Sequence, residues 1–170
     1  TQALINGEAL ALELLASDSD QYHYRVSYTV TAETHEGAVT IALQAEDFAG
    51  NVGELFSATA DDSAVVVDKT PPEVGVLSFV DLVNSGRDEQ PIITTDTLFT
   101  LSLSGVDALE PGAVVSYQRS LDGTAWQTTA IEQSLAGDTQ SYYYRALVTD
   151  SAGNQSVSNG LQVVVDQQLP

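Results

Sequence analysis

The chain has 170 residues, of which 43% are hydrophobic, and this share is large enough for packed cores and excludes wholesale disorder. Its 24 acidic residues against 5 basic ones give a net charge of −19, which disfavours nucleic acid and anionic membranes as partners. It contains no cysteine, which excludes disulfides and thiolate metal sites, and no apolar run long enough to insert in a membrane.

The first part of the chain, residues 1–68, is predicted to be a series of short strands. Asn6-Gly7 is typical of a two-residue hairpin turn. Residues 22–30 alternate in the way of a half-buried strand. Residues 8–15 would also suit a helix, but the hairpin before them favours a strand. The predicted strands are 3–5, 9–15, 22–30, 39–45 and 64–67.

A complete immunoglobulin-type sandwich domain has about seven strands, so the five strands predicted here are too few. Counting back from the last strand, we expect this first module to lack its two opening strands. The missing strands could have been removed from the sequence or could come from another chain. The absence of an initiator Met favours a piece of a longer protein.

Residues 69–72, Lys-Thr-Pro-Pro, are predicted to be a linker. Proline fixes φ, so two consecutive prolines favour an extended, semi-rigid connection over a flexible one. A linker this short predicts that the two modules are close neighbours.

The second part, residues 73–170, is predicted to be a complete β-sandwich. Asp122-Gly123 predicts a hairpin turn, and turn signals recur at short intervals between strands. The single tryptophan, Trp126, is predicted to lie in the core. The predicted strands are 74–80, 97–104, 114–120, 125–128, 131–135, 140–149 and 161–165.

An internal repeat links the two parts. The motif Asp-x-Ala-Gly-Asn occurs at 47–51 and at 150–154, and the motif Val-Val-Val-Asp occurs at 65–68 and at 163–166. Self-similarity at the length of a domain predicts two homologous modules that end in the same hairpin.

These motifs, together with Thr-Pro-Pro at 70–72, resemble the bacterial immunoglobulin-like modules that repeat in tandem in giant secreted adhesins of the cell surface. The resemblance covers nearly the whole chain. It implies an all-β fold of two immunoglobulin-like or fibronectin III-like sandwiches. It also implies an extracellular stalk, with a role in adhesion and biofilm formation, that calcium stiffens at module junctions. The sequence departs from the pattern after residue 166, where no Pro-Pro linker follows.

A calcium site is predicted at the junction of the two modules. The topology of such a sandwich places the end of the first module opposite the loops at the start of the second. Calcium takes 6–8 oxygen ligands, which carboxylates, amides and water supply. The predicted ligands are Asp68, Asp107, Glu110, Asp150 and Asn154.

Three further residues would form half-sites toward absent neighbouring modules: Asp47, Asn51 and Asp166. An alternative interpretation needs no metal, because Asp before Ala-Gly-Asn also makes a good turn in which the carboxylate accepts backbone hydrogen bonds. For Asp81 and Asp88 we favour a solvated loop over an ion site.

The sequence therefore predicts structural extender modules on the bacterial cell surface. Their expected partners are neighbouring modules of the same chain, and other domains would contact a host or surface glycan or protein. No arrangement typical of an active site occurs, so we expect no enzymatic activity. Two alternatives stay open: a module that binds carbohydrate or protein, and an accessory region of a secreted enzyme.

Overall fold

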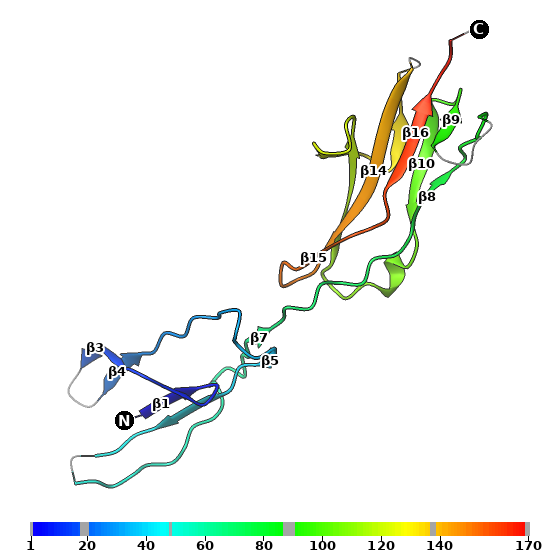
Figure 1. Cartoon of the computed structure of the whole chain (residues 1–170). Helices are drawn as coiled ribbons and strands as arrows, with labels where there is room; N and C mark the ends of the chain where they lie inside the picture. The colour runs from blue at the N-terminus through cyan, green and yellow to red at the C-terminus, as the bar shows by residue number, and fades with distance from the viewer. Residues whose placement is uncertain (1, 18–20, 48, 87–90, 137–138, 169–170) are drawn as a thin grey trace. The chain divides into compact units, whose positions relative to one another are not determined.

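The computed structural model describes residues 2–17, 21–47, 49–86, 91–136 and 139–168 (Figure 1). The chain divides into two compact units, Thr1–Lys69 and Thr70–Pro170, so the boundary falls at the start of the predicted linker. Apart from one 3-10 turn, every described element is a β-strand, and the prediction of an all-β fold is confirmed. No described helix is long and apolar enough to cross a membrane.

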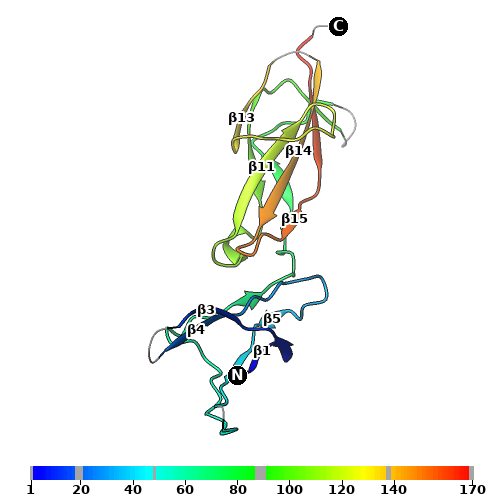
Figure 2. The ribbon, with the colours of Figure 1, turned by 90° about the vertical axis from the view of Figure 1, so that its left-hand side faces the viewer.

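Unit 2 consists of two sheets. The smaller has the order β13-β10-β8, and the larger has the order β12-β11-β14-β16-β9, with β15 paired to β14. Figure 2 shows β11 and β14 lying side by side in the larger sheet. The strands are β8 (Leu77–Val80), β9 (Ile92–Thr94), β10 (Leu98–Leu103), β11 (Val114–Ser120), β12 (Gln127–Thr128), β13 (Glu132–Ser134), β14 (Gln140–Thr149), β15 (Gln155–Val157) and β16 (Leu161–Val165).

The sequence pattern missed two of these strands. β9 is only three residues long and lies between the predicted strands 74–80 and 97–104, yet it pairs in parallel with β16. β15 belongs to the return from the second Asp-x-Ala-Gly-Asn loop and pairs with β14. Both are short, and neither shows the alternation over four or more residues that identifies a strand in sequence.

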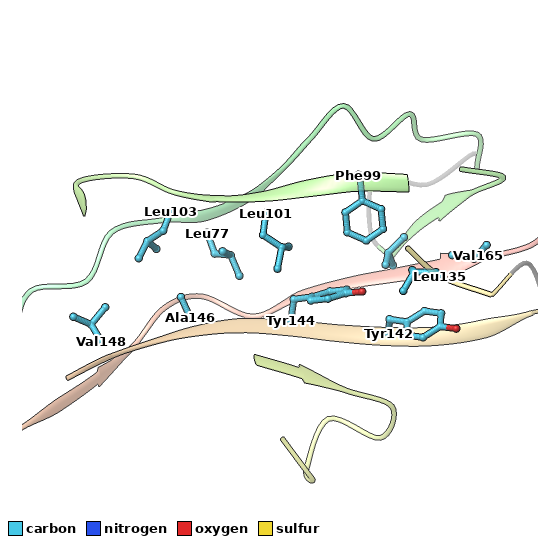
Figure 3. Packing of buried hydrophobic residues seen from close by; sticks show 11 residues of the cluster. Leu77, Phe99, Leu101, Leu103, Leu135, Tyr142, Tyr144, Ala146, Val148 and Val165 are labelled. Atoms are coloured by element: carbon cyan, nitrogen blue, oxygen red, sulfur yellow. The ribbon is translucent and has the colours of Figure 1, made fainter. Parts of the chain in front are cut away.

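The core of unit 2 lies between its two sheets. Along β14 the side chains alternate, with Tyr142, Tyr144, Ala146 and Val148 all buried. Figure 3 shows these residues pointing toward the leucines and Phe99 of the facing strands. The rest of the buried cluster is Leu77, Phe99, Leu101, Leu103, Leu135, Val163 and Val165.

Tyr144 is the centre of an aromatic group within this core. Its ring meets those of Phe79 and Phe99 edge to face, each at 5.8 Å between centroids. This geometry is the favourable one for aromatic pairs. The Tyr144 hydroxyl is buried and has no hydrogen-bond partner among the described residues, and burial raises the pKa of this phenol well above its usual range.

The prediction that Trp126 belongs to the core is wrong. Trp126 is only half-buried and is not part of the buried cluster. It lies under the guanidinium of Arg145, which is 4.2 Å from the ring centroid. Tyr144 takes the central place that sequence reasoning gave to the tryptophan.

Unit 1 consists of three small sheets, with the orders β2-β1-β6, β3-β4 and β5-β7. The predicted Asn6-Gly7 hairpin is present, since β1 pairs with β2 and both turn residues have positive φ, 51° and 79°. No helix forms over residues 8–15. The strands are β1 (Gln2–Ile5), β2 (Glu8–Leu10), β3 (Glu13–Ser17), β4 (Tyr22–Arg25), β5 (Gly37–Ala38), β6 (Ile41–Gln44) and β7 (Val66–Val67).

The predicted strand over residues 22–30 is shorter in the structure. β4 ends at Arg25, and Tyr22 and Tyr24 are 65% and 46% exposed. The alternating pattern is present in the sequence, but among the described residues the strand that pairs with β4 is the exposed β3. A segment with alternating apolar and polar residues forms a β-strand only where a neighbouring strand pairs with it.

The repeat is visible in the strand register. Gly37 pairs with Val67 in unit 1, and Gln140 pairs with Val165 in unit 2. These are the equivalent positions when the two Asp-x-Ala-Gly-Asn loops and the two closing Val-Val-Val-Asp motifs are superimposed in sequence. The two units therefore build their final hairpin in the same way.

The burial of this hairpin differs between the units. Val163 is fully buried in unit 2, whereas its equivalent Val65 is 63% exposed in unit 1. Similarly, Ala146 is buried and its equivalent Leu43 is 37% exposed. Among the described residues of unit 1, the buried apolar side chains are Ala3, Ile5 and Val67.

The first prediction concerns local stability. Because unit 1 buries far less apolar surface, its backbone hydrogen bonds should open at lower free energy than those of unit 2. In hydrogen–deuterium exchange of the whole chain, the amides of β6 should exchange at least tenfold faster than those of β14. Equal protection of the two strands would show that unit 1 has a core of comparable stability.

The second prediction concerns Tyr144. A buried hydroxyl without a partner costs about 1–3 kcal/mol, so Tyr144→Phe should leave the free energy of unfolding unchanged or raise it. Tyr144→Ala should lower it by about 3–5 kcal/mol. Both values can be measured by urea denaturation. A loss of more than about 1 kcal/mol in Tyr144→Phe would mean that the hydroxyl is paired in solution.

Candidate metal-binding loops

The second Asp-x-Ala-Gly-Asn loop, residues 150–154, directly follows β14. Both carboxylate oxygens of Asp150 accept hydrogen bonds from Asn154, one from its backbone N–H and one from its side-chain amide, each at 2.8 Å. The backbone N–H of Asp150 donates to the Asn154 carbonyl at 3.0 Å, and the Asp150 carbonyl accepts from the backbone N–H of Gly153 at 3.3 Å. Gly153 has a φ of +94°, which favours glycine at this position.

The first loop, residues 47–51, has the same geometry. Asp47 accepts from the backbone N–H of Asn51 at 2.8 Å and from its side-chain amide at 2.7 Å. It also accepts from the backbone N–H of Ala49 at 2.8 Å. Gly50 has a φ of +84°. Both units thus form the turn that the motif predicts, and each carboxylate is held in a fixed orientation.

These hydrogen bonds change the acidity of the two carboxyl groups. Burial alone raises the pKa of Asp150, but the hydrogen bonds from Asn154, Gly153 and Ala152 outweigh it, and the pKa lies below its usual range. The side-chain and backbone hydrogen bonds from Asn51 lower the pKa of Asp47 in the same way. Both loops therefore favour an ionised carboxylate.

Within unit 2, Glu110 and Asp150 come together. The Glu110 carboxylate accepts a hydrogen bond from the backbone N–H of Ser151 at 3.3 Å. One oxygen of Glu110 and one of Asp150 lie within 4.8 Å of each other. Two oxygens bound to the same calcium, at about 2.3–2.6 Å each, are separated by no more than about 5 Å. The pair is thus spaced to hold one cation.

This pair also has an electrostatic reason to bind a cation. Two ionised carboxylates at this distance repel each other. Glu110 is exposed, whereas Asp150 is 6% exposed. A buried carboxylate is screened less by salt than an exposed one, so a bound cation would relieve more repulsion here than on an open surface.

The other predicted ligands have different surroundings. Asp107 lies on the exposed 3-10 turn Val106–Ala108. Asp166 follows β16, and its carboxylate accepts hydrogen bonds from the Thr139 hydroxyl and the backbone of Gln168. Asp68 is half-buried and follows β7 in unit 1, so its share in a site with the residues of unit 2 stays a prediction.

Among the described residues, no group of three metal-ligating side chains includes any of these residues: Asp47, Asn51, Asp107 and Asp166. Asp81 has a φ of +63°, which is typical of a turn residue. Asp88 lies outside the described residues.

Sequence reasoning missed one arrangement in unit 2. Arg145, Gln118 and Trp126 are joined by a hydrogen bond and a cation–π contact on β14, β11 and the segment before β12. The alternation of residues 140–149 does predict that Arg145 points outward. It does not identify the partners of Arg145, because these depend on which strands pair with β14.

Neither the protein-family models nor the curated proteins include a match to this chain.

The third prediction follows from the lowered pKa of Asp150. A lowered pKa stabilises the fold above the pKa of the unfolded chain, about 3.9, and this contribution is lost as pH falls through the folded-state pKa. In the presence of a chelator, Asp150→Asn should therefore lower the melting temperature most near neutral pH. The difference from the wild type should shrink below about pH 4.

The control for this experiment is Val157→Ala, which removes no titratable group from a neighbouring strand. Its difference from the wild type should not depend on pH. A melting-temperature difference for Asp150→Asn that stays constant from neutral pH to about pH 2.5 would contradict the assignment.

Proposed function

We propose that the chain is a pair of tandem immunoglobulin-like modules that form part of the extracellular stalk of a bacterial surface adhesin, with bound calcium as a stiffening ion. The observation that supports this most is the repeated Asp-x-Ala-Gly-Asn loop. It has the same hydrogen bonds in both units, and in unit 2 it is joined by the carboxylate of Glu110.

The topology of unit 2 supports the immunoglobulin-like part of the proposal. Its strands form a three-stranded sheet facing a larger sheet, and an immunoglobulin-type sandwich likewise consists of two facing sheets. The parallel pairing of β9 with β16 places the first part of the domain beside its last strand. The equal register of the closing hairpins in the two units supports a tandem repeat.

The calcium part of the proposal rests on Glu110 and Asp150. Their two carboxylates supply hard oxygen ligands of the kind that calcium prefers, and water and backbone carbonyls complete the coordination. We propose Asp68 as a further ligand, because it is the last residue before the linker, 69–72, in the sequence. A third carboxylate would raise the affinity for a divalent cation further.

The net charge of −19 fits this role. An acidic surface keeps a secreted rod soluble and concentrates divalent cations around it. In this proposal the chain is a spacer, its partners are neighbouring modules, and adhesion to a glycan or protein is carried out by other domains.

The fourth prediction tests the calcium site. With a dissociation constant of about 0.1 mM, typical of extracellular modules, about 10 mM calcium adds about 2.7 kcal/mol to the free energy of unfolding. The melting temperature of unit 2 should therefore rise by several degrees in calcium relative to EDTA. Asp150→Asn and Glu110→Gln should each remove most of this increase.

A matched control is Asp107→Asn, which removes a nearby carboxylate on the exposed 3-10 turn and should keep the calcium response. Asp68→Ala tests the proposed third ligand and should weaken the response without abolishing it. Identical melting curves of the wild type in calcium and in EDTA would rule out the proposed site.

A further inference from the structure

The larger sheet of unit 2 has a shallow hollow of about 450 Å3 on its outer face. It lies away from the calcium loop and contains none of the residues proposed to bind the ion. The residues that line it are Gly123, Trp126, Tyr143, Gly160, Leu161 and Gln162.

Strand register explains why these side chains meet. Tyr143 and Arg145 alternate with the buried Tyr142 and Tyr144 of β14, so they point to the opposite face of the sheet. Gln162 of β16 pairs with Tyr143. Gln118 of β11 pairs with Arg145 on the other side. The outer face of β14 is thus flanked by an amide on each neighbouring strand.

The aromatic side chains of the hollow are held in place by polar contacts. Arg145 donates from Nε to the Gln118 side-chain carbonyl at 2.7 Å, and its guanidinium covers the Trp126 ring at 4.2 Å from the centroid. Gln162 donates to the Tyr143 hydroxyl at 3.2 Å. These contacts order the two aromatic rings before any ligand binds, which lowers the entropic cost of binding.

Two glycines keep the hollow open. A Cβ atom on Gly160 would meet no atom within 4 Å, so the space beside it is empty. Gly123 has a φ of +74° and lies against the Tyr143 ring, where a Cβ would be 3.8 Å from the nearest ring atom. Both glycines line the hollow, so a larger side chain at either position would reduce its volume.

We propose that this hollow is a binding site for a neutral saccharide. The faces of aromatic rings attract the weakly positive C–H groups of a sugar ring, and the Gln162 amide can bind its hydroxyl groups. Ordered aromatic rings with a few placed polar groups are the usual composition of a small-ligand site. The net charge of −19 disfavours uronic or sulfated sugars, since a surface of this sign repels anions.

The single tryptophan of the chain makes the test direct, because its fluorescence reports on the hollow. The whole chain in EDTA would be titrated with cellohexaose, mannohexaose and maltohexaose up to about 10 mM each. At least one should change the Trp126 emission in a saturable way. Use of EDTA separates this test from the calcium proposal, so one proposal can fail without the other.

Variants then locate the site. Gln162→Ala, which removes one hydrogen-bonding group, should weaken binding about fivefold. Gly160→Leu, which fills the hollow without a backbone clash, should weaken it more than tenfold. The matched control Gln155→Ala removes an amide from β15, which lies outside the hollow, and should bind as the wild type does.

Two results would overturn the proposal. One is the absence of a saturable signal for all three hexasaccharides with the wild type, provided that urea denaturation shows a folded chain. The other is a saturable signal that Gly160→Leu and Gln162→Ala leave unchanged, because the sugar would then bind elsewhere.

Discussion

The packing of β14 against the smaller sheet is the contact on which unit 2 depends. This strand is ten residues long. The residues that it contributes to the core are Tyr142, Tyr144, Ala146 and Val148. The same alternation sets the outer face, where Tyr143 and Arg145 lie. The strand ends at Thr149, directly before Asp150, so its position also fixes the loop that carries the candidate calcium ligand. The register of β14 with its neighbouring strands therefore determines the core, the hollow on the outer face of the sheet and the position of the loop 150–154.

Unit 1 shows what this packing contributes. It has the same closing hairpin and the same Asp-x-Ala-Gly-Asn hydrogen bonds as unit 2, but Val65 and Leu43 are exposed where their equivalents are buried. The local loop therefore forms without a covered core, because backbone and side-chain hydrogen bonds within five residues suffice to hold it. Hydrophobic burial, which provides most of the stability of a domain, is what differs between the two units.

Local features of this chain could be predicted from its sequence, and pairing between distant segments could not. The Asn6-Gly7 hairpin, the turn at 150–154 and the alternation of 140–149 depend on residues close in sequence, and the structure has all three. The strand β9 and the position of Trp126 depend on which segment pairs with which. For the candidate site, the motif identified Asp150 and Asn154. The sequence also predicted Glu110 and Asp107 as ligands beside Asp150, and among the described residues the structure places Glu110, and not Asp107, in a group with Asp150.

We thus expect that a cation joins Glu110 and Asp150. This ion can be tested for by determining the structure of the whole chain from crystals grown in calcium chloride. We expect an ion at about 2.3–2.6 Å from a carboxylate oxygen of each residue. A structure at the same calcium concentration with only water between the two carboxylates would contradict it.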